Sequence, residues 1–145
     1  MKTFSLKGIG AGVLAVLVLS IPLSLMFGYY ASAVYDNLAP GVNFANEAET
    51  QKFASQFLSH PLTIAYGVIA ILVGTGVPSY ISALVAGRAF VLHSMAIGSI
   101  VSVSCLLEWE TLSQFPVLFV VLIGFTLVVA YAAGRLRKRQ VASAG

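Results

Sequence analysis

Four long stretches of this sequence contain no charged residue, and they constrain the fold more than any other feature. They cover residues 8–35, 53–87, 89–107 and 111–134. An apolar helix needs about 20 residues to cross the hydrocarbon layer of a bilayer, which is about 30 Å thick. Each stretch is long enough to hold one such helix. We therefore predict four membrane-spanning helices, over residues 8–34, 62–87, 89–107 and 115–134.

The composition agrees with a chain that faces lipid. Hydrophobic residues make up 59% of the sequence and charged residues only 9%. A soluble domain carries about 25% charged residues, because water must wet its surface. The same values exclude a disordered chain. We predict an all-α fold, a four-helix transmembrane bundle that forms one integral membrane domain over residues 1–145.

The first stretch also has features of a secretory signal peptide. Lys2 and Lys7 form a basic start, and Ala31-Ser32-Ala33 fits a small-x-small cleavage pattern. The apolar run between them is much longer than the ~7–15 residues of a signal peptide. We therefore favour an uncleaved span, and a mature chain that begins at Val34 would contradict this interpretation.

The charged residues separate into two groups, which predicts the orientation. With four spans, one side of the membrane carries Lys2, Lys7, Arg88, Arg135, Arg137, Lys138 and Arg139, and the other carries Asp36, Glu47, Glu49, Glu108, Glu110 and Lys52. Lys and Arg concentrate on the cytoplasmic side of membrane proteins. We predict that the protein lies in the cell (inner) membrane and that both chain ends are on the cytoplasmic side.

The connections between the predicted spans differ in length. Residues 86–88 must form a tight turn between the second and third spans, with Gly87 in the left-handed conformation that ends a helix. An outer loop covers residues 36–61. The second half of this loop has a pattern typical of a short amphipathic helix. Asn46 is its predicted cap and Glu49 completes a capping box. Phe53 and Phe57 share one face at i, i+4 spacing.

Small residues at four-residue spacing occur in every predicted span. Such ridges let helix backbones approach closely in lipid. The ridges are Gly8/Gly12, Ala70/Gly74, Ser79/Ala83/Gly87, Ser94/Gly98/Ser102 and Ala130/Gly134. We expect the ridges of the second and third spans to face each other, and the favoured role of all ridges is packing within the chain. The alternative is that one ridge binds a second copy or another membrane protein.

Two predicted spans contain proline, which removes a backbone donor and kinks a helix. Pro22 lies in the middle of the first span, and Pro78 follows Gly74 and Gly76 in the second. Broken helices line substrate sites in transporters, but kinks are also common without such a role. These residues are therefore either packing kinks or a functional break.

Few polar side chains are candidates for chemistry. His93 lies near Arg88 at the start of the third span, where we expect an interfacial polar residue. His60 precedes the second span and is predicted to lie on the same side as Glu108 and Glu110. One histidine and two carboxylates are a possible set of metal ligands, but nothing in the sequence fixes these three residues close to one another. We predict no metal, no cofactor and no catalytic residue.

The segment Ser82-Ala83-Leu84-Val85-Ala86-Gly87-Arg88, followed by Leu92-His93, resembles one hairpin of uncharacterised small bacterial four-span membrane proteins. Those proteins also place a Gly-Arg turn, followed by Leu-His, between spans rich in small residues. The resemblance implies a four-span fold in a bacterial cytoplasmic membrane. It implies no biochemical activity.

No motif for nucleophilic catalysis, zinc hydrolysis or phosphate binding occurs in the sequence, so an enzyme is the least favoured class. The single cysteine, Cys105, excludes a CxxC redox pair. We predict an accessory or interaction subunit of a membrane assembly, with lipid as its surroundings and no nucleic-acid partner. The alternative is a small oligomeric transporter or channel that uses the interrupted second span.

Overall fold

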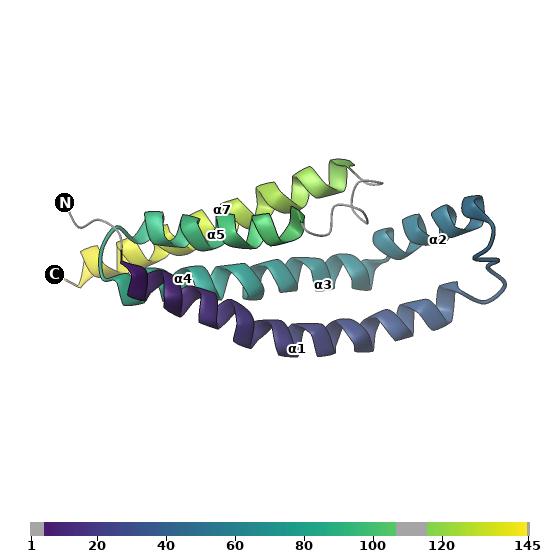
Figure 1. Ribbon diagram of the computed structural model, residues 1–145, viewed down its shortest axis with the longest axis horizontal. Coiled ribbons are helices and arrows are strands. Elements are labelled where there is room, and N and C mark those ends of the chain that lie inside the picture. The colour runs from purple at the N-terminus through teal and green to yellow at the C-terminus, as the bar shows by residue number, and fades with distance from the viewer. Residues whose placement is uncertain (1–4, 107–115, 145) are drawn as a thin grey trace. The chain divides into compact units, whose positions relative to one another are not determined.

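The computed structural model describes residues 5–106 and 116–144, and these residues are helical apart from short connections. No strand occurs in this described part of the chain. The helices are α1 (Leu6–Leu38), α2 (Glu47–Ser59), α3 (Pro61–Ile71), the π-helical η1 (Leu72–Gly76), α4 (Val77–Ala86), α5 (Phe90–Leu106) and α7 (Pro116–Ser143) (Figure 1). The predicted all-α class is confirmed.

Among the described residues, three helices are long and apolar enough to cross a membrane. They are α1, the continuous helix Pro61–Ala86 and α7. They coincide with the first, second and fourth predicted spans. The third predicted span forms α5, which has 17 residues. Trp109, Glu108 and Glu110, from the predicted turn after it, lie outside the described residues.

The last helix is longer than the sequence predicted. We expected it to end at Gly134, where the charged residues begin, but α7 continues to Ser143. Arg, Lys and Gln are good helix formers, so the chain stays helical after its apolar part ends. Hydropathy marks the end of a span and does not mark the end of the helix that contains it.

The chain divides into two compact units. Unit 1 contains Met1–Leu19 and Ile71–Gly145, and unit 2 contains Ser20–Ala70. Helix α1 and the helix Pro61–Ala86 each contribute residues to both units. The units are described separately below.

In unit 1, small residues allow close contact between helices. A Cβ built at Gly98 would lie 2.5 Å from the Cβ of Ala130, and one built at Gly134 would lie 2.7 Å from the Cα of Val91. Helices α5 and α7 are therefore antiparallel and interlock along these two ridges. Such contacts supply the packing that associates helices in lipid.

The first turns of α1 pack against the same unit. A Cβ at Gly8 would lie 2.8 Å from the Cβ of Ala86, and one at Gly12 would lie 2.6 Å from Cδ1 of Ile97. Ile97 and Ala83 are completely buried. The ridges Gly8/Gly12, Ser94/Gly98/Ser102 and Ala130/Gly134 therefore make contacts within the chain.

The pairing of the ridges is only partly as expected. Ser94 of α5 faces α4, but Gly98 faces α7, so the ridge over 94–102 does not pack against α4 alone. A helix has several faces, and sequence spacing does not say which neighbour each face meets. The tight turn is confirmed, because Gly87 has a left-handed backbone with φ 68° and ends α4. Ala89 also has a positive φ of 47°.

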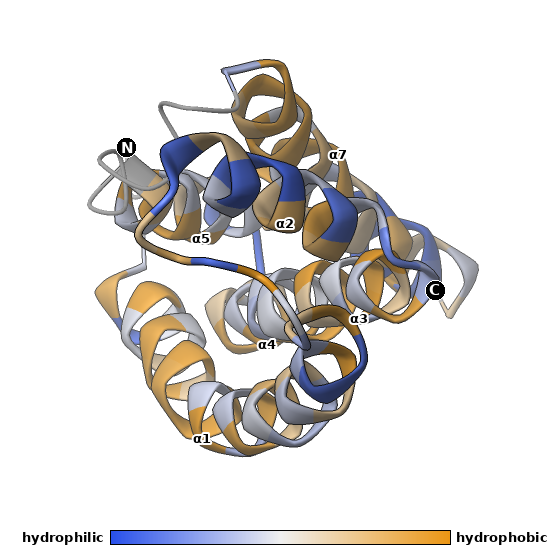
Figure 2. Ribbon diagram, turned by 90° about the vertical axis from the view of Figure 1, so that its right-hand side faces the viewer, coloured by the Kyte–Doolittle hydropathy of each residue, from blue (hydrophilic) through white to orange (hydrophobic). Residues whose placement is uncertain are grey.

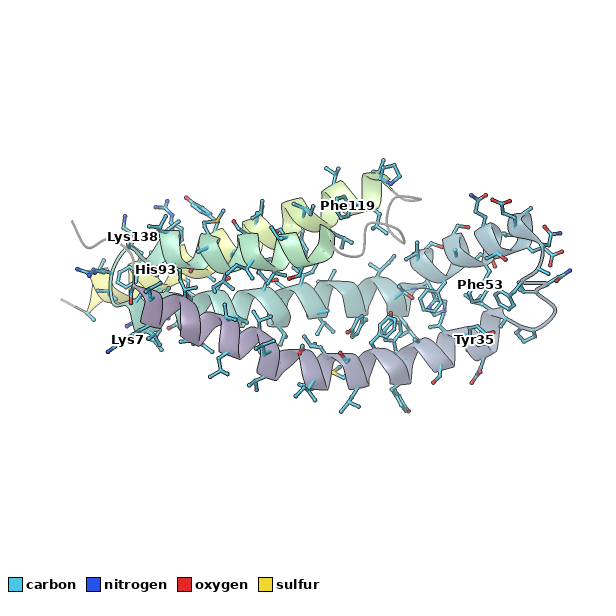
Figure 3. The ribbon with its side chains drawn as sticks, viewed as in Figure 1. Lys7, Tyr35, Phe53, His93, Phe119 and Lys138 are labelled. Atoms are coloured by element: carbon cyan, nitrogen blue, oxygen red, sulfur yellow. The ribbon has the colours of Figure 1, made fainter. Side chains whose placement is uncertain are left out.

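Unit 2 is held together by aromatic side chains. Tyr30 and Tyr66 stack with ring centroids 4.6 Å apart, and the Tyr66 hydroxyl donates a hydrogen bond of 2.8 Å to the carbonyl oxygen of Leu23. Further ring contacts link α1, α2, α3 and the segment between α1 and α2. They join Phe27, Tyr30, Tyr35, Phe44, Phe53, Phe57 and Tyr66, and Figure 3 shows Tyr35 beside Phe53.

Helix α2 forms in the second half of the loop, as predicted. The Asn46 side chain caps it by accepting a hydrogen bond from the Ala48 amide at 3.0 Å. Glu49 bonds the amide of Asn43 at 2.7 Å and the Asn46 side chain at 3.4 Å, which differs from the expected return to the Asn46 amide. Phe53 and Phe57 share one face, with ring centroids 6.1 Å apart.

The surfaces of the long helices are apolar. Leu14, Leu17, Ile21 and Leu25 of α1 are each at least 60% exposed. On α7, Val117, Val120 and Val128 are similarly exposed. Figure 2 shows this apolar colouring along α1 and along the first part of α7, in contrast to the hydrophilic turns of α2. These surfaces suit contact with lipid, where no water needs to be bound.

Candidate functional site

The interior of unit 1 contains a row of buried polar side chains, here called the polar seam. It consists of Thr75, Ser79, Ser82, His93, Ser94, Ser102 and Thr126, of which none is more than 8% exposed. These residues come from η1, α4, α5 and α7. A buried polar group costs free energy unless it is hydrogen-bonded, so the partners of the seam indicate what it does.

His93 lies at the end of the seam near the chain's basic residues, and its side chain is completely buried. Its Nε2 atom accepts a hydrogen bond of 2.8 Å from the Ser5 amide. Its Nδ1 atom lies 3.0 Å from the Ala89 carbonyl oxygen and donates to it. This pair of bonds requires a neutral ring with the proton on Nδ1. His93 therefore ties the start of α1 to α5, and its ring is buried within the protein.

Ser79 and Ser94 form the centre of the seam. The Ser94 hydroxyl donates to the Ser79 carbonyl oxygen at 2.9 Å, and the Ser79 hydroxyl donates to the Ser94 carbonyl oxygen at 3.2 Å. The Ser82 hydroxyl donates to the His93 carbonyl oxygen at 3.5 Å. These bonds join α4 to α5. The hydroxyls therefore act between helices.

The seam continues between α5 and α7. The contacts of Gly98 with Ala130 and of Gly134 with Ser94 define an antiparallel register. One further helical turn in this register brings Ser102 opposite Thr126. Thr126 donates to the Leu122 carbonyl oxygen of its own helix at 2.8 Å. The Ser102 hydroxyl has no hydrogen-bond partner among the described residues.

The interrupted part of the second predicted span is a π-helical turn. It covers Leu72–Gly76, and Pro78 follows at the start of α4. π-turns often occur at functional sites. Here Thr75 and Pro78 are buried, and a Cβ at Gly76 would lie 3.2 Å from Cγ1 of Val129. Part of the predicted Gly74–Pro78 break, at Gly76, is thus packed against Val129 of α7.

The other candidate residues are distributed over both units and the undescribed segment. Pro22 is inside α1 and exposed, in unit 2. Arg88 is exposed in the turn between α4 and α5. His60 caps the end of α2, and its Nδ1 atom accepts a hydrogen bond of 3.3 Å from the Leu62 amide. Glu108 and Glu110 lie outside the described residues, within which no group of three potential metal ligands occurs.

The chemistry of the seam is that of structural hydrogen bonding. In every seam bond given above, the hydroxyl donates to a backbone carbonyl oxygen. The two nitrogens of the His93 ring bond the Ser5 amide and the Ala89 carbonyl oxygen. The sequence predicted Ser94 as a packing residue but did not predict the burial of His93. Neighbouring residues of a helix do not share a face, so the ridge at Ser94 gave no signal for its neighbour.

No family model, curated protein or solved structure matches this chain.

Proposed function

We propose that the chain is a four-span protein of a bacterial cytoplasmic membrane, one integral membrane domain with both ends on the cytoplasmic side. Three of its helices have the length and apolar character that spanning requires. With 17 residues, α5 is at the lower end of the range of about 17–25 residues for a span, and it packs along α7. Its predicted outer end falls outside the described residues.

The basic residues support the orientation. Gly8, next to Lys7, packs on Ala86, two residues before Arg88. Gly134, next to Arg135, packs on Val91. The described basic residues of unit 1 therefore gather at one end of that unit, where Figure 3 shows Lys7 and Lys138. Such a cluster is typical of the cytoplasmic side of a membrane protein.

The orientation has a direct test. A reporter of compartment is fused after Ser143, and a second is inserted after Tyr35. We expect the first reporter to be active in the cytoplasm and the second to be active outside it. Reporters that respond from the same compartment would refute the four-span arrangement. A fusion at Arg88, in the exposed turn, is the matched control and must agree with the C-terminal fusion.

Within the membrane we infer an accessory or interaction subunit. The observation that supports this role is the closed interior of unit 1. Atoms of neighbouring helices occupy the space beside the glycines at 8, 12, 98 and 134. The central hydroxyls of the seam donate hydrogen bonds to backbone carbonyl oxygens. A solute therefore finds no prepared polar site there. The outer apolar surface is what remains available for interaction.

Extraction in mild detergent tests the accessory role. The tagged chain should come out of its native membrane with a partner protein in fixed stoichiometry. Two variants separate a surface effect from misfolding. Tyr29→Ser changes a side chain that is 83% exposed, whereas Ile97→Ser changes a buried one. A chain that runs only as a lone monomer would contradict an accessory role.

The π-helical turn favours one alternative, a small oligomeric transporter or channel. In that case the Leu72–Gly76 segment would change conformation during transport, because π-turns are less regular than α-helix. Purified protein in liposomes should then move a solute, and Pro78→Ala should change the rate. The Pro22→Ala variant is a control in a helix without a π-turn. An absence of flux across a broad panel of solutes would exclude this alternative.

A further inference from the structure

A groove runs along one side of unit 1, between the segment Leu72–Tyr80 and helix α7. We call it the basic groove. Its volume is about 750 Å³, within the range of ~300–1,000 Å³ that is usual for sites of small molecules. Leu72, Val77 and Leu136 line it, and Arg135 and Arg139 lie at one end.

Small residues explain why the groove is there. Gly76, Ala132 and Ala133 line it without long side chains. The Tyr80 hydroxyl donates a hydrogen bond of 2.6 Å to Oε1 of Gln140, which ties α4 to α7 beside the basic end. The groove is therefore held open by helix packing and by a specific bond.

The charge of the groove is unbalanced. Arg135 and Arg139 are exposed and lie one helical turn apart. Arg135 also lies over the ring of Tyr131, with Cζ 5.7 Å from the ring centroid. The described residues of unit 1 contain no Asp or Glu, so no described carboxylate of this unit neutralises these arginines. A ligand with a negative headgroup complements them.

The dimensions of the groove suit one leaflet of a membrane. From Val129 to Arg139 it extends roughly 15 Å along α7, at 1.5 Å per residue. Half of a hydrocarbon layer is also about 15 Å thick. The apolar part, from Val129 to Arg135, covers roughly 9 Å of this length and fits within one leaflet, and the arginines follow on the side where the headgroups begin.

We propose that the basic groove binds an anionic glycerophospholipid. Its phosphate pairs with Arg135 and Arg139, and an acyl chain lies against Leu72, Val77 and Leu136. The proposal rests on the membrane placement proposed above and adds a specific lipid partner to it. Basic pockets between transmembrane helices on the cytoplasmic side bind such headgroups in other membrane proteins.

The test compares two lipids on the full-length chain. The protein is reconstituted in phosphatidylcholine bilayers that contain a minor fraction of spin-labelled phosphatidylglycerol or, in parallel, spin-labelled phosphatidylcholine. We expect a motionally restricted component that prefers phosphatidylglycerol. In Arg135→Gln/Arg139→Gln the preference should fall by roughly fivefold per arginine, which corresponds to about 1 kcal/mol for each base at a membrane surface.

Matched variants separate the groove from general attraction. Arg137→Gln/Lys138→Gln removes the same charge from the same helix outside the groove, and it should keep most of the preference. Ala132→Phe fills the groove and should reduce binding without changing charge, whereas Val128→Phe, outside the groove, should not. Equal losses in both charge variants would overturn the proposal, as would binding that Ala132→Phe leaves unchanged.

Two further outcomes concern the wild-type chain and need no variant to fold. Excess inorganic phosphate should not displace the labelled lipid, and displacement would show a phosphate site in place of a lipid site. A chain that integrates into the bilayer but shows no lipid preference would refute the groove and leave the membrane placement standing. A chain that does not integrate would overturn both proposals.

Discussion

Ser79 and Ser94 exchange hydrogen bonds across the α4–α5 hairpin, each hydroxyl donating to the carbonyl oxygen of the other residue, at 3.2 and 2.9 Å. Both residues are completely buried. The pair joins the two helices at a point where no water competes. It is also reciprocal, so the loss of one hydroxyl leaves the other bond in place.

This reciprocity predicts the effect of removing the hydroxyls. Ser94→Ala and Ser79→Ala should each lower the free energy of unfolding by about 0.6 kcal/mol, the average for such bonds between membrane helices. Denaturation in mixed detergent micelles measures this change. The double variant gives the coupling between the two bonds. Ser104→Ala is the control, because that exposed hydroxyl bonds only its own helix at Ile100, and it should be nearly neutral.

The contact between Gly98 and Ala130 predicts sensitivity to added volume. Gly98→Ala should destabilise unit 1 by about 1–3 kcal/mol, because the new methyl group has no space. The variant Gly98→Ala/Ala130→Gly moves the methyl group to the other helix and should recover part of the loss. Gly124→Ala on α7 is the control, since nothing lies within 4 Å of that site. Equal losses at 98 and 124 would contradict the described α5–α7 register.

The hydrogen bond between the Ser5 amide and His93 should protect the start of α1 from hydrogen exchange. His93→Leu removes the acceptor of the Ser5 amide, and hydrogen exchange of that amide should increase roughly three- to tenfold, the effect of one hydrogen bond. His93→Gln keeps an acceptor and should exchange more slowly than His93→Leu. Leu92→Ala changes a half-exposed neighbour as a control. An unchanged Ser5 amide in His93→Leu would show that the ring does not hold this segment.

The Tyr66 hydroxyl should contribute to the stability of unit 2. Tyr66→Phe keeps the ring stacked on Tyr30 but removes the bond to the Leu23 carbonyl oxygen. We expect a loss of about 0.5–1.5 kcal/mol in the free energy of unfolding. Tyr29→Phe is the matched control, because the Tyr29 side chain is 83% exposed. A larger loss at Tyr29 than at Tyr66 would be inconsistent with the described aromatic cluster.

The sequence predicted those parts of the fold that depend on local patterns. Runs without charge located α1, the helix Pro61–Ala86 and α7, because apolar character is a property of each segment alone. Gly87 and Asn46 were identified as the residues that end α4 and begin α2, because turn and cap geometry depends on a few neighbouring residues. The π-turn was anticipated as an interruption near Pro78, but its type was not.

Features that depend on packing between helices were not predictable in this way. Spacing identified the small residues of the ridges, but it did not show that Gly98 would face Ala130 and not α4. Nor did it show that His93 would bond Ser5, a residue 88 positions away. The basic groove depends on the packing of two segments that are distant in sequence, so its separate residues gave no sign of it.

The continuity of α7 has a mechanical consequence. The helix has 28 residues, which amounts to roughly 42 Å at 1.5 Å per residue, against a hydrocarbon layer of about 30 Å. In the proposed membrane placement, its last turns therefore extend beyond the lipid or tilt with the rest of the helix. No hinge separates the apolar part of α7 from its basic last turns. A torque applied near Ser143 is therefore transmitted directly to Ala130 and to the helices packed against it.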